Sequence, residues 1–356
     1  MKNCLFVLRN KKINNFDRTS DSLSAFSASG IYFDRLEYCA YDDSQEITRS
    51  LKELKGNYEN TVILSPKTME EALKSFIEKL FDAQFDTFGV LNSAEGNVFL
   101  IISDGESKLS EAAVVEIISK NCGVVYSRAY VRTVGAPASL IDLAIAKAKE
   151  LCPECDFNVT DSFSDCTVEI VYPENISKQL YDGMLRGIIG KLNDYIYALD
   201  DISLAERLYQ ILQLRRMKIS VAESFTGGGI SKRLVDVPGV SEVYFEGLNT
   251  YSNESKIKRL GVDALSLRQY GAVSEETAYA MAAGLLATGD CDISVATTGI
   301  AGPKSDSTLK PVGLVYISVG TRENISVFKY QLNGSRRQIT ETAINLALFH
   351  AFKTLK

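Results

Sequence analysis

The segment from Lys218 to Lys232 constrains the fold of this chain more than any other. An apolar run, Ile219 to Ala222, leads into the turn Glu223-Ser224-Phe225-Thr226-Gly227-Gly228, and residues that favour a helix follow. A glycine-rich turn between a strand and a helix is typical of an open α/β sheet, where ligands bind at the carboxyl ends of the strands. Backbone N–H groups and the helix dipole favour a phosphate or a developing oxyanion there. The alternative is an ordinary capped turn.

Length and charge limit the classes of protein that fit. With 356 residues the chain suggests two or three domains. The net charge of −6 supplies no wide basic face, which argues against a general nucleic-acid binder. No apolar run approaches the roughly 20 residues that span a bilayer. We therefore expect a cytoplasmic protein with no nucleic-acid or membrane partner.

The pattern of apolar residues predicts a multi-domain α/β protein with three segments. Residues 1–130 alternate strands with helices, at 4–8, 22–29, 44–54, 61–64, 69–80 and 98–102. Residues 131–199 predict a small α+β module, with helices at 139–151 and 176–192 and a strand at 166–172. Residues 200–356 predict a three-layer α/β domain. Its strands are expected at 218–222, 243–248, 292–297, 312–319 and 325–331, and its helices at 204–214, 228–235, 253–260, 275–287 and 336–354.

The cysteines and the single histidine restrict the chemistry. Seven scattered cysteines fit reduced thiols. Cys152 and Cys155 form one CxxC with Cys166 nearby, but a structural zinc site needs four ligands, so a turn between a helix and a strand is favoured. We expect no metal and no cofactor. His350 lies in an apolar helical run, where a partly buried position is expected. A Ser-His-Asp triad is therefore disfavoured, and a lysine or a carboxylate must activate any nucleophile.

Four polar clusters follow predicted strands in the last segment, at 223–228, 249–256, 297–303 and 333–337. Loops at the ends of strands in one sheet can converge on one crevice. Ser224 is the candidate nucleophile, and Tyr251 and Lys256 are candidate proton-transfer groups. A desolvated lysine has a lowered pKa and can accept the proton of a serine. Taken alone, Tyr251 could pack at an interface and Lys256 could lie on a solvated helix face.

The same clusters contain candidates for holding the substrate. Arg336 and the glycine-rich backbones could hold a phosphate. The complete set of substrate-binding and phosphate-binding candidates is Glu223, Thr226, Gly227, Gly228, Thr298, Gly299 and Arg336. Glu223 has two alternative roles, as a cap of the following helix or as a group that orients Lys256. Backbone N–H groups from Thr226 to Gly228 are expected to hold the oxyanion.

These clusters resemble the C-terminal domain of the CinA (competence/damage-inducible protein A) family. Ala222 to Gly228 is similar to the family's AESCTGG, Thr250 to Lys256 to TYSNxxK, Gly271 to Ser274 to GAVS, and Thr298 to Pro303 with Lys310 to Gly313 to TGIAGP…KPVG. The resemblance covers nearly all of residues 200–356. It implies hydrolysis of the amide of nicotinamide mononucleotide, with release of ammonia. It also implies that Ser224, Tyr251 and Lys256 are catalytic and that Arg336 is the motif arginine.

Three positions depart from the family pattern. Phe225 stands in place of a cysteine, Ser305-Asp306 in place of a glycine pair, and Ser335 in place of an aspartate. The first should change the packing beside Ser224, and the second adds a carboxylate to a loop near the expected phosphate. They leave open an alternative function, a catalytically silent or regulatory protein that binds a pyridine nucleotide.

The rest of the chain resembles the family more weakly. Val134-Gly135-Ala136 and Asp194 to Tyr197 are similar to its middle module and linker. Residues 1–130 resemble its molybdopterin-binding-like domain in layout only. Leu8 to Lys12 stands where that domain has Gly-Asp-Glu, and Leu64 to Lys67 where it has Thr-Gly-Gly-x-Gly-Pro-Thr. We therefore expect no ADP-ribose pyrophosphatase activity from this segment, a scaffold or dimerisation role instead, and a homo-oligomer, such as a dimer, with a small nucleotide as its substrate.

Overall fold

The computed structural model describes residues 2–9, 19–104, 107–121, 126–303 and 310–356. The chain divides into two compact units, residues 1–128 with 171–177 and residues 129–170 with 178–356. Both are mixed α/β structures, as the sequence predicts. No helix among the described residues is long and apolar enough to cross a membrane.

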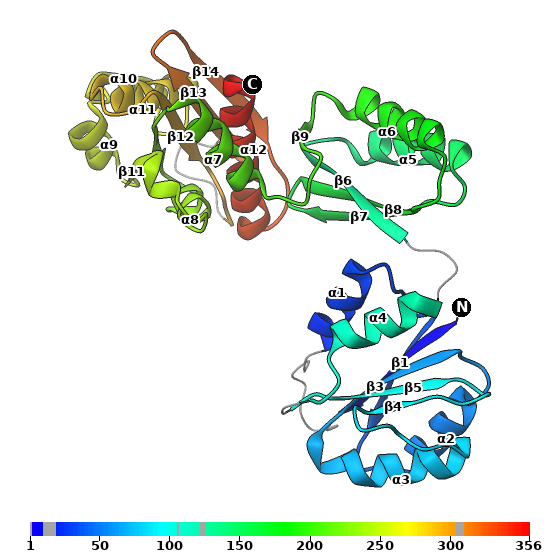
Figure 1. Ribbon diagram of the computed structural model, residues 1–356. Helices are drawn as coiled ribbons and strands as arrows, with labels where there is room; N and C mark the ends of the chain where they lie inside the picture. The colour runs from blue at the N-terminus through cyan, green and yellow to red at the C-terminus, as the bar shows by residue number, and fades with distance from the viewer. Residues whose placement is uncertain (1, 10–18, 105–106, 122–125, 304–309) are drawn as a thin grey trace. The chain divides into compact units, whose positions relative to one another are not determined.

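The first unit is a three-layer sandwich. Its strands are β1 (Asn3–Arg9), β2 (Arg35–Ala40), β3 (Asn60–Ser65), β4 (Val90–Leu91) and β5 (Asn97–Ile102), and its helices are α1 (Thr19–Ala28), α2 (Ser44–Leu54), η1 (Lys67–Met69), α3 (Glu70–Phe81) and α4 (Glu111–Asn121). The sheet order is β2-β1-β3-β5-β4, and only β4 is antiparallel to its neighbour. Helices α1 and α4 cover one face, and α2 and α3 cover the other (Figure 1). The central strands β1, β3 and β5 are apolar over most of their length because both of their faces are buried.

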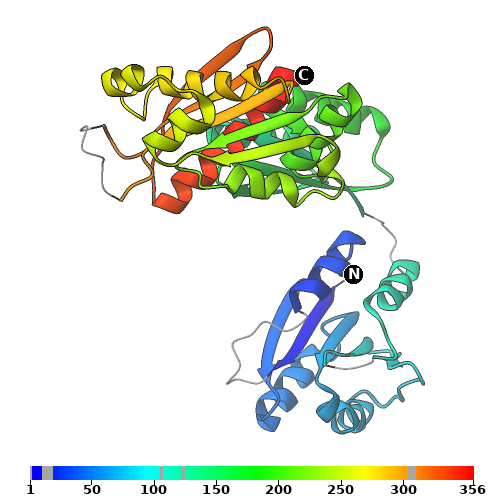
Figure 2. The ribbon, with the colours of Figure 1, turned by 90° about the vertical axis from the view of Figure 1, so that its left-hand side faces the viewer.

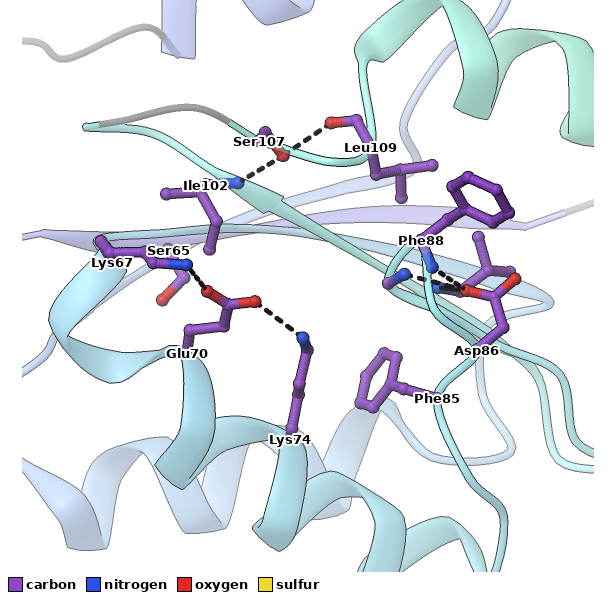
Figure 3. A network of polar contacts seen from close by, with 12 residues as sticks. Ser65, Lys67, Glu70, Lys74, Phe85, Asp86, Phe88, Ile102, Ser107 and Leu109 are labelled. Carbon is purple, nitrogen blue, oxygen red and sulfur yellow. Dashed lines mark hydrogen bonds and ion pairs between the residues drawn. The ribbon is translucent and has the colours of Figure 1, made fainter.

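Charged groups of this unit are engaged in local structure. Glu70 contacts both Lys67 and Lys74 after strand β3, the latter at 2.7 Å. Asp86 accepts hydrogen bonds from the backbone N–H groups of three residues, at 2.8 to 2.9 Å (Figure 3). These carboxylates therefore stabilise the turn and helix to which they belong.

The second unit begins with a four-stranded sheet, here called the middle sheet. Its strands are β6 (Tyr126–Val134), β7 (Asp156–Ser162), β8 (Asp165–Pro173) and β9 (Ile196–Ala198), in the order β7-β8-β6-β9, with helices α5 (Ala138–Leu151) and α6 (Lys178–Leu192). The two helices lie side by side on one face of this sheet (Figure 1). Cys152 to Cys155 forms the turn between α5 and β7, as predicted.

The C-terminal part of the second unit is the predicted three-layer α/β domain. Its elements are α7 (Leu204–Arg215), β10 (Ile219–Glu223), α8 (Gly229–Val235), η2 (Val240–Glu242), β11 (Tyr244–Asn249), α9 (Asn253–Leu260), α10 (Ala264–Tyr270), α11 (Glu275–Ala287), β12 (Ile293–Gly299), β13 (Leu314–Thr321), β14 (Ile325–Gln331) and α12 (Arg336–Leu355). The sheet order is β11-β10-β12-β13-β14. Strands β11, β10 and β12 are parallel, whereas β13 and β14 are antiparallel to their neighbours.

Two helical layers bury this sheet (Figures 1 and 2). Helices α7, α8 and α12 pack on one face through residues such as Leu208, Ile230 and Ile344. Helices α9, α10 and α11 pack on the other through Leu260, Leu267 and Met281. Because β10 and β11 are adjacent and parallel, their carboxyl ends lie together, and the loops that follow them lie at one edge of the sheet.

Candidate active site

Glu223, the last residue of β10, organises the turn that leads into α8. Its side chain is buried, and its carboxylate accepts hydrogen bonds from the backbone N–H groups of Gly228 (3.1 Å), Ile230 (3.0 Å) and Ser231 (2.9 Å). It also accepts one from the hydroxyl of Ser231 at 2.7 Å. Of the two predicted roles, the structure shows the helix cap, since both carboxylate oxygens are engaged in the turn and neither contacts Lys256. The negative charge also complements the dipole of α8.

Glycine is required at the three consecutive positions 227, 228 and 229 for two different structural reasons. Gly227 and Gly228 have φ values of 63° and 97°, a region that residues with a side chain adopt at a cost. Gly229 lies against helix α12, because a Cβ atom at this position would be 2.4 Å from Cδ1 of Ile344. The turn is therefore shaped by its own backbone and by close packing against α12.

Ser224 and Lys256 are in direct contact, as the strand-end pattern predicts. Nζ of Lys256 lies 3.0 Å from Oγ of Ser224. The same Nζ lies 2.7 Å from the carbonyl oxygen of Thr250 and 3.2 Å from that of Tyr251. Lys256 is 1% exposed, so the solvated helix face is excluded. The backbone N–H of Thr250 donates to the carbonyl of Glu223 at 2.8 Å and so joins the two loops.

Burial changes the protonation of this lysine. Desolvation lowers the pKa of Lys256 from its usual 10.5 to about 8. Within the described part of the chain, no carboxylate pairs with its ammonium group. A neutral amine has two N–H donors and one lone pair. With the two N–H groups directed to the carbonyls of Thr250 and Tyr251, the lone pair is left for the Ser224 hydroxyl.

Tyr251 contributes to this contact through its backbone. Its side chain is 65% exposed, and its hydroxyl has no hydrogen bond to Ser224 or Lys256. The proton-transfer role of its phenol group stays a prediction.

The structure corrects two of the three expected oxyanion donors, Gly227 and Gly228, and leaves Thr226 available. The N–H of Gly227 donates to the carbonyl of Ser224 at 3.1 Å, and the N–H of Gly228 donates to Glu223. Both groups are therefore engaged inside the turn. The backbone N–H groups of Phe225 and Thr226 donate no hydrogen bond to any residue that the structure describes. These two are the available donors beside Ser224.

Thr226 contacts Thr297, which belongs to the predicted polar cluster 297–303 but is not among the candidate site residues. Its hydroxyl lies 2.7 Å from that of Thr297, and both side chains are buried. Thr297 is paired in register with Glu223 across β10 and β12. Thr298 instead donates to the carbonyl of Ala272 at 2.6 Å, and a Cβ at Gly299 would be 2.6 Å from Val315. Thr298 and Gly299 therefore shape the neighbouring loop and do not contact Ser224.

Phe225 and Arg336 connect the Ser224 turn with helix α12. Phe225, which stands in place of the family's cysteine, is buried with Ala301, Val315, Ile339 and Ala343. Ile339 lies one turn along α12 from Arg336, whose Nη1 donates to the carbonyl of Gly302 at 2.7 Å. Arg336 itself is exposed and contacts neither Ser224 nor Lys256.

The second and third departures from the family pattern fall elsewhere. Ser335 caps α12, because its side chain accepts a hydrogen bond from the N–H of Gln338 and the Gln338 side chain accepts one in return. A serine can therefore take the place of the aspartate as a cap. Ser305 and Asp306 lie outside the described residues.

His350 occupies the partly buried helix position that the sequence predicts. Its Nε2 lies 2.6 Å from the hydroxyl of Tyr330, and its ring stacks on Phe328 with the centroids 3.5 Å apart.

The buried thiol of Cys155 has its pKa raised to about 12 by desolvation. Among the described residues, no group of three or more His, Cys, Asp or Glu side chains is arranged to hold a metal ion.

Comparison with known proteins agrees with the site. Residues 201–355 match the family model described as the CinA C-terminal domain. A CinA-like protein of Kosmotoga olearia is 36% identical over 272 residues, which cover 73% of this chain and 65% of that protein. A CinA-like protein of Fusobacterium nucleatum is 42% identical over 174 residues, covering 48% and 42%. The matched segments thus cover less than two thirds of these relatives.

A solved structure is similar to part of this chain. The crystal structure of the competence/damage inducible protein CihA from Agrobacterium tumefaciens is 36% identical, covers 43% of this chain and 93% of that one, and has a TM-score of 0.41. The motifs that surround Ser224 and Lys256 agree with the family model, and residues 201–355 of this chain are a CinA C-terminal domain.

Proposed function

We propose that this protein is an amidohydrolase that converts nicotinamide mononucleotide to nicotinate mononucleotide and ammonia. The observation that carries the proposal is the buried Lys256 amine 3.0 Å from the Ser224 hydroxyl. A serine activated by a neutral lysine is suited to acyl transfer from an amide. The substrate rests on the resemblance of the surrounding motifs, since the names of the relatives state no reaction.

The first half of the reaction forms an acyl-enzyme. Oγ of Ser224 attacks the amide carbon while its proton moves to Nζ of Lys256. The carbonyl oxygen becomes an oxyanion, for which the N–H groups of Phe225 and Thr226 are the proposed donors. The C–N bond then breaks, and the leaving nitrogen takes the proton from Lys256 and departs as ammonia.

The second half releases the carboxylate. Water attacks the ester carbon and gives a proton to Lys256, and the ester C–O bond breaks as Ser224 Oγ recovers that proton. Each half begins with Lys256 in its neutral form, and burial makes that form accessible near neutral pH because it lowers the pKa from 10.5 to about 8. No metal or cofactor takes part in these steps.

The phosphate of the nucleotide needs a separate cation. Arg336 is proposed for this role because it is exposed at the first position of α12 and uses one guanidinium nitrogen to hold the Gly302 carbonyl. Its remaining N–H donors suit a phosphate.

For residues 1–130 we propose a scaffold or dimerisation role without catalysis. The lysines that follow β3, Lys67 and Lys74, are both paired with Glu70. They are therefore less available to bind an anionic ligand at this end of the sheet.

The proposal is tested by measuring ammonia released from nicotinamide mononucleotide by the full chain. Wild type should release ammonia, and Ser224→Ala should reduce the rate by at least about 10³-fold. Ser266→Ala, which changes a serine hydroxyl on α10 outside the pair, is the matched control and should be unchanged. Equal rates for wild type and Ser224→Ala would exclude the nucleophile. Binding of the nucleotide by wild type without turnover would instead favour the silent pyridine-nucleotide-binding protein.

A further inference from the structure

A buried asparagine in α12 joins the middle sheet to helix α8. Nδ2 of Asn345 donates to the carbonyl oxygens of Ser162 (3.0 Å) and Phe163 (2.9 Å), and its Oδ1 accepts a hydrogen bond from Nη1 of Arg233. Asn345 is 1% exposed. Its amide orientation is determined by these partners, because two carbonyls need donors and a guanidinium needs an acceptor. A fully satisfied buried polar network of this kind holds its elements in one arrangement.

The residues on the middle-sheet side form the hairpin turn between β7 and β8. Phe163 and Ser164 have φ values of 57° and 67°, as in the tight turns that match the twist of paired strands. The carbonyl of Ser164 accepts a hydrogen bond from the N–H of Gly135 at 2.9 Å, which anchors the turn to its own sheet. The guanidinium of Arg337 lies 5.7 Å from the centre of the Phe163 ring. The hairpin turn, residues 162–164, is therefore a fixed structure that contacts α12 at two places.

The residue on the other side, Arg233, belongs to the helix that carries the Ser224 turn. Helix α8 spans only seven residues, and the N–H groups of its second and third residues, Ile230 and Ser231, donate to Glu223. Arg233 also pairs with Glu341 of α12. Ile344, adjacent to Asn345, fills the space beside Gly229. The position of α8, and with it that of the Ser224 turn, therefore depends on α12 at both ends of this short helix.

We infer that the 162–164 hairpin turn is a positioning element of the candidate active site and that Asn345 and Arg233 are positioning residues. Asn345 transmits the position of the hairpin turn to Arg233, Arg233 holds α8, and α8 with Glu223 places Ser224 against Lys256. The middle sheet therefore helps to hold the candidate active site in place and does not only connect the two ends of the chain. An effect of these residues on kcat for ammonia release rests on the proposed function. An effect on the hydrogen exchange of α8 does not.

The test separates the two arms of the network in the full chain. Asn345→Asp keeps an acceptor for Arg233 but replaces the two donors that face the hairpin carbonyls. Arg233→Gln weakens the α8 arm and leaves the hairpin arm intact. Each should raise the hydrogen-exchange rates of the Ile230 and Ser231 amides about tenfold and lower kcat for ammonia release about tenfold, with KM nearly unchanged. The double variant should add little to either single one, because both act on one network.

Lys353→Met is the matched control. Like Asn345, Lys353 lies on α12 and donates to a backbone carbonyl near the middle sheet, that of Asp194, at 3.3 Å. Unlike Asn345, it is exposed and has no hydrogen bond to α8. The exchange rates of Ile230 and Ser231 and the kcat of the Lys353→Met variant should equal those of wild type. Wild-type exchange at Ile230 and Ser231 in a folded Asn345→Asp protein overturns the inference, and so does a wild-type kcat. If wild type releases no ammonia, the proposed function fails, and the exchange rates alone decide the inference.

Discussion

Lys256 reaches Ser224 with its amine enclosed between two backbone carbonyls, those of Thr250 and Tyr251, in the loop that begins its own helix. The seven residues from Thr250 to Lys256 thus supply both the base and the groups that orient it. No charged partner is needed, because carbonyl oxygens accept from either the neutral or the charged amine. This arrangement accounts for a buried lysine that can exchange a proton near neutral pH.

The lowered pKa of Lys256 predicts a pH-dependent stability. Between about pH 8 and 10.5 the unfolded chain holds a proton that the folded protein lacks, so the free energy of unfolding contributed by this group rises with pH. Relative to Lys256→Met, wild type should gain up to about 3 kcal/mol across this window. Urea unfolding of both proteins at pH 8 and at pH 10 measures the difference. A constant difference at the two pH values would contradict the lowered pKa.

Glu223→Gln tests the cap of α8. The amide keeps the size of the carboxylate but offers one acceptor oxygen to four donors and loses the charge that faces the helix dipole. We expect a loss of about 3 kcal/mol in the free energy of unfolding. Glu254→Gln is the control, because its side chain is 73% exposed and pairs only with Lys258 on the surface. Its loss should stay below about 0.5 kcal/mol, and an equal loss in both variants would refute the cap.

Phe225→Ala tests whether the residue that replaces the family's cysteine is part of the packing. Phe225 is 6% exposed within the cluster that connects the turn with α12, so truncation should cost about 3–5 kcal/mol. Phe88→Ala removes a ring of the same size that is 62% exposed and should cost far less. Chemical denaturation compares the two. Comparable losses would mean that Phe225 has no special packing role.

His350 predicts a loss of stability in mild acid. Desolvation, with a smaller contribution from Lys353, lowers its pKa from 6.5 to about 4. Below pH 6.5 the unfolded chain binds a proton that the folded protein does not, so stability falls as the pH falls towards 4. Between pH 7 and pH 5 wild type should lose about 2 kcal/mol more than His350→Gln, which retains a neutral partner for Tyr330. Parallel losses in urea titrations at these two pH values would show that His350 does not titrate as described.

The sequence predicts the parts of the fold that depend on local patterns. Buried parallel strands such as β10 and β12 are short apolar runs, and helices such as α11 begin at a capping serine, Ser274. The expectation of a serine paired with a lysine also came from the chain itself. A single histidine in an apolar helix leaves a lysine or a carboxylate as the base, and the strand-end rule brings the loop of Lys256 to that of Ser224.

The features that sequence analysis missed depend on pairings between distant segments. Strand β2 is an edge strand in which the charged residues Arg35 and Glu37 alternate with Leu36 and Tyr38, so it shows no clear apolar run. Thr297 reaches Thr226 only through the register of β10 with β12. The oxyanion donors are expected from Thr226 to Gly228 because a glycine-rich turn suggests free N–H groups, but the N–H of Gly227 donates to the carbonyl of Ser224 and that of Gly228 to the carboxylate of Glu223. Asn345 looks like one polar residue in an apolar helix until its three partners are known.

The most direct test of the account is the pH dependence of kcat/KM for ammonia release from nicotinamide mononucleotide. Because Lys256 must be neutral to take the proton of Ser224, kcat/KM should rise tenfold per pH unit at low pH and level off above an apparent pKa of about 8. Lys256→Met should lose this rise together with nearly all of the activity. An active wild type with a flat profile from about pH 6.5 to 9.5, or a Lys256→Met variant with wild-type activity, would contradict the lysine-activated serine.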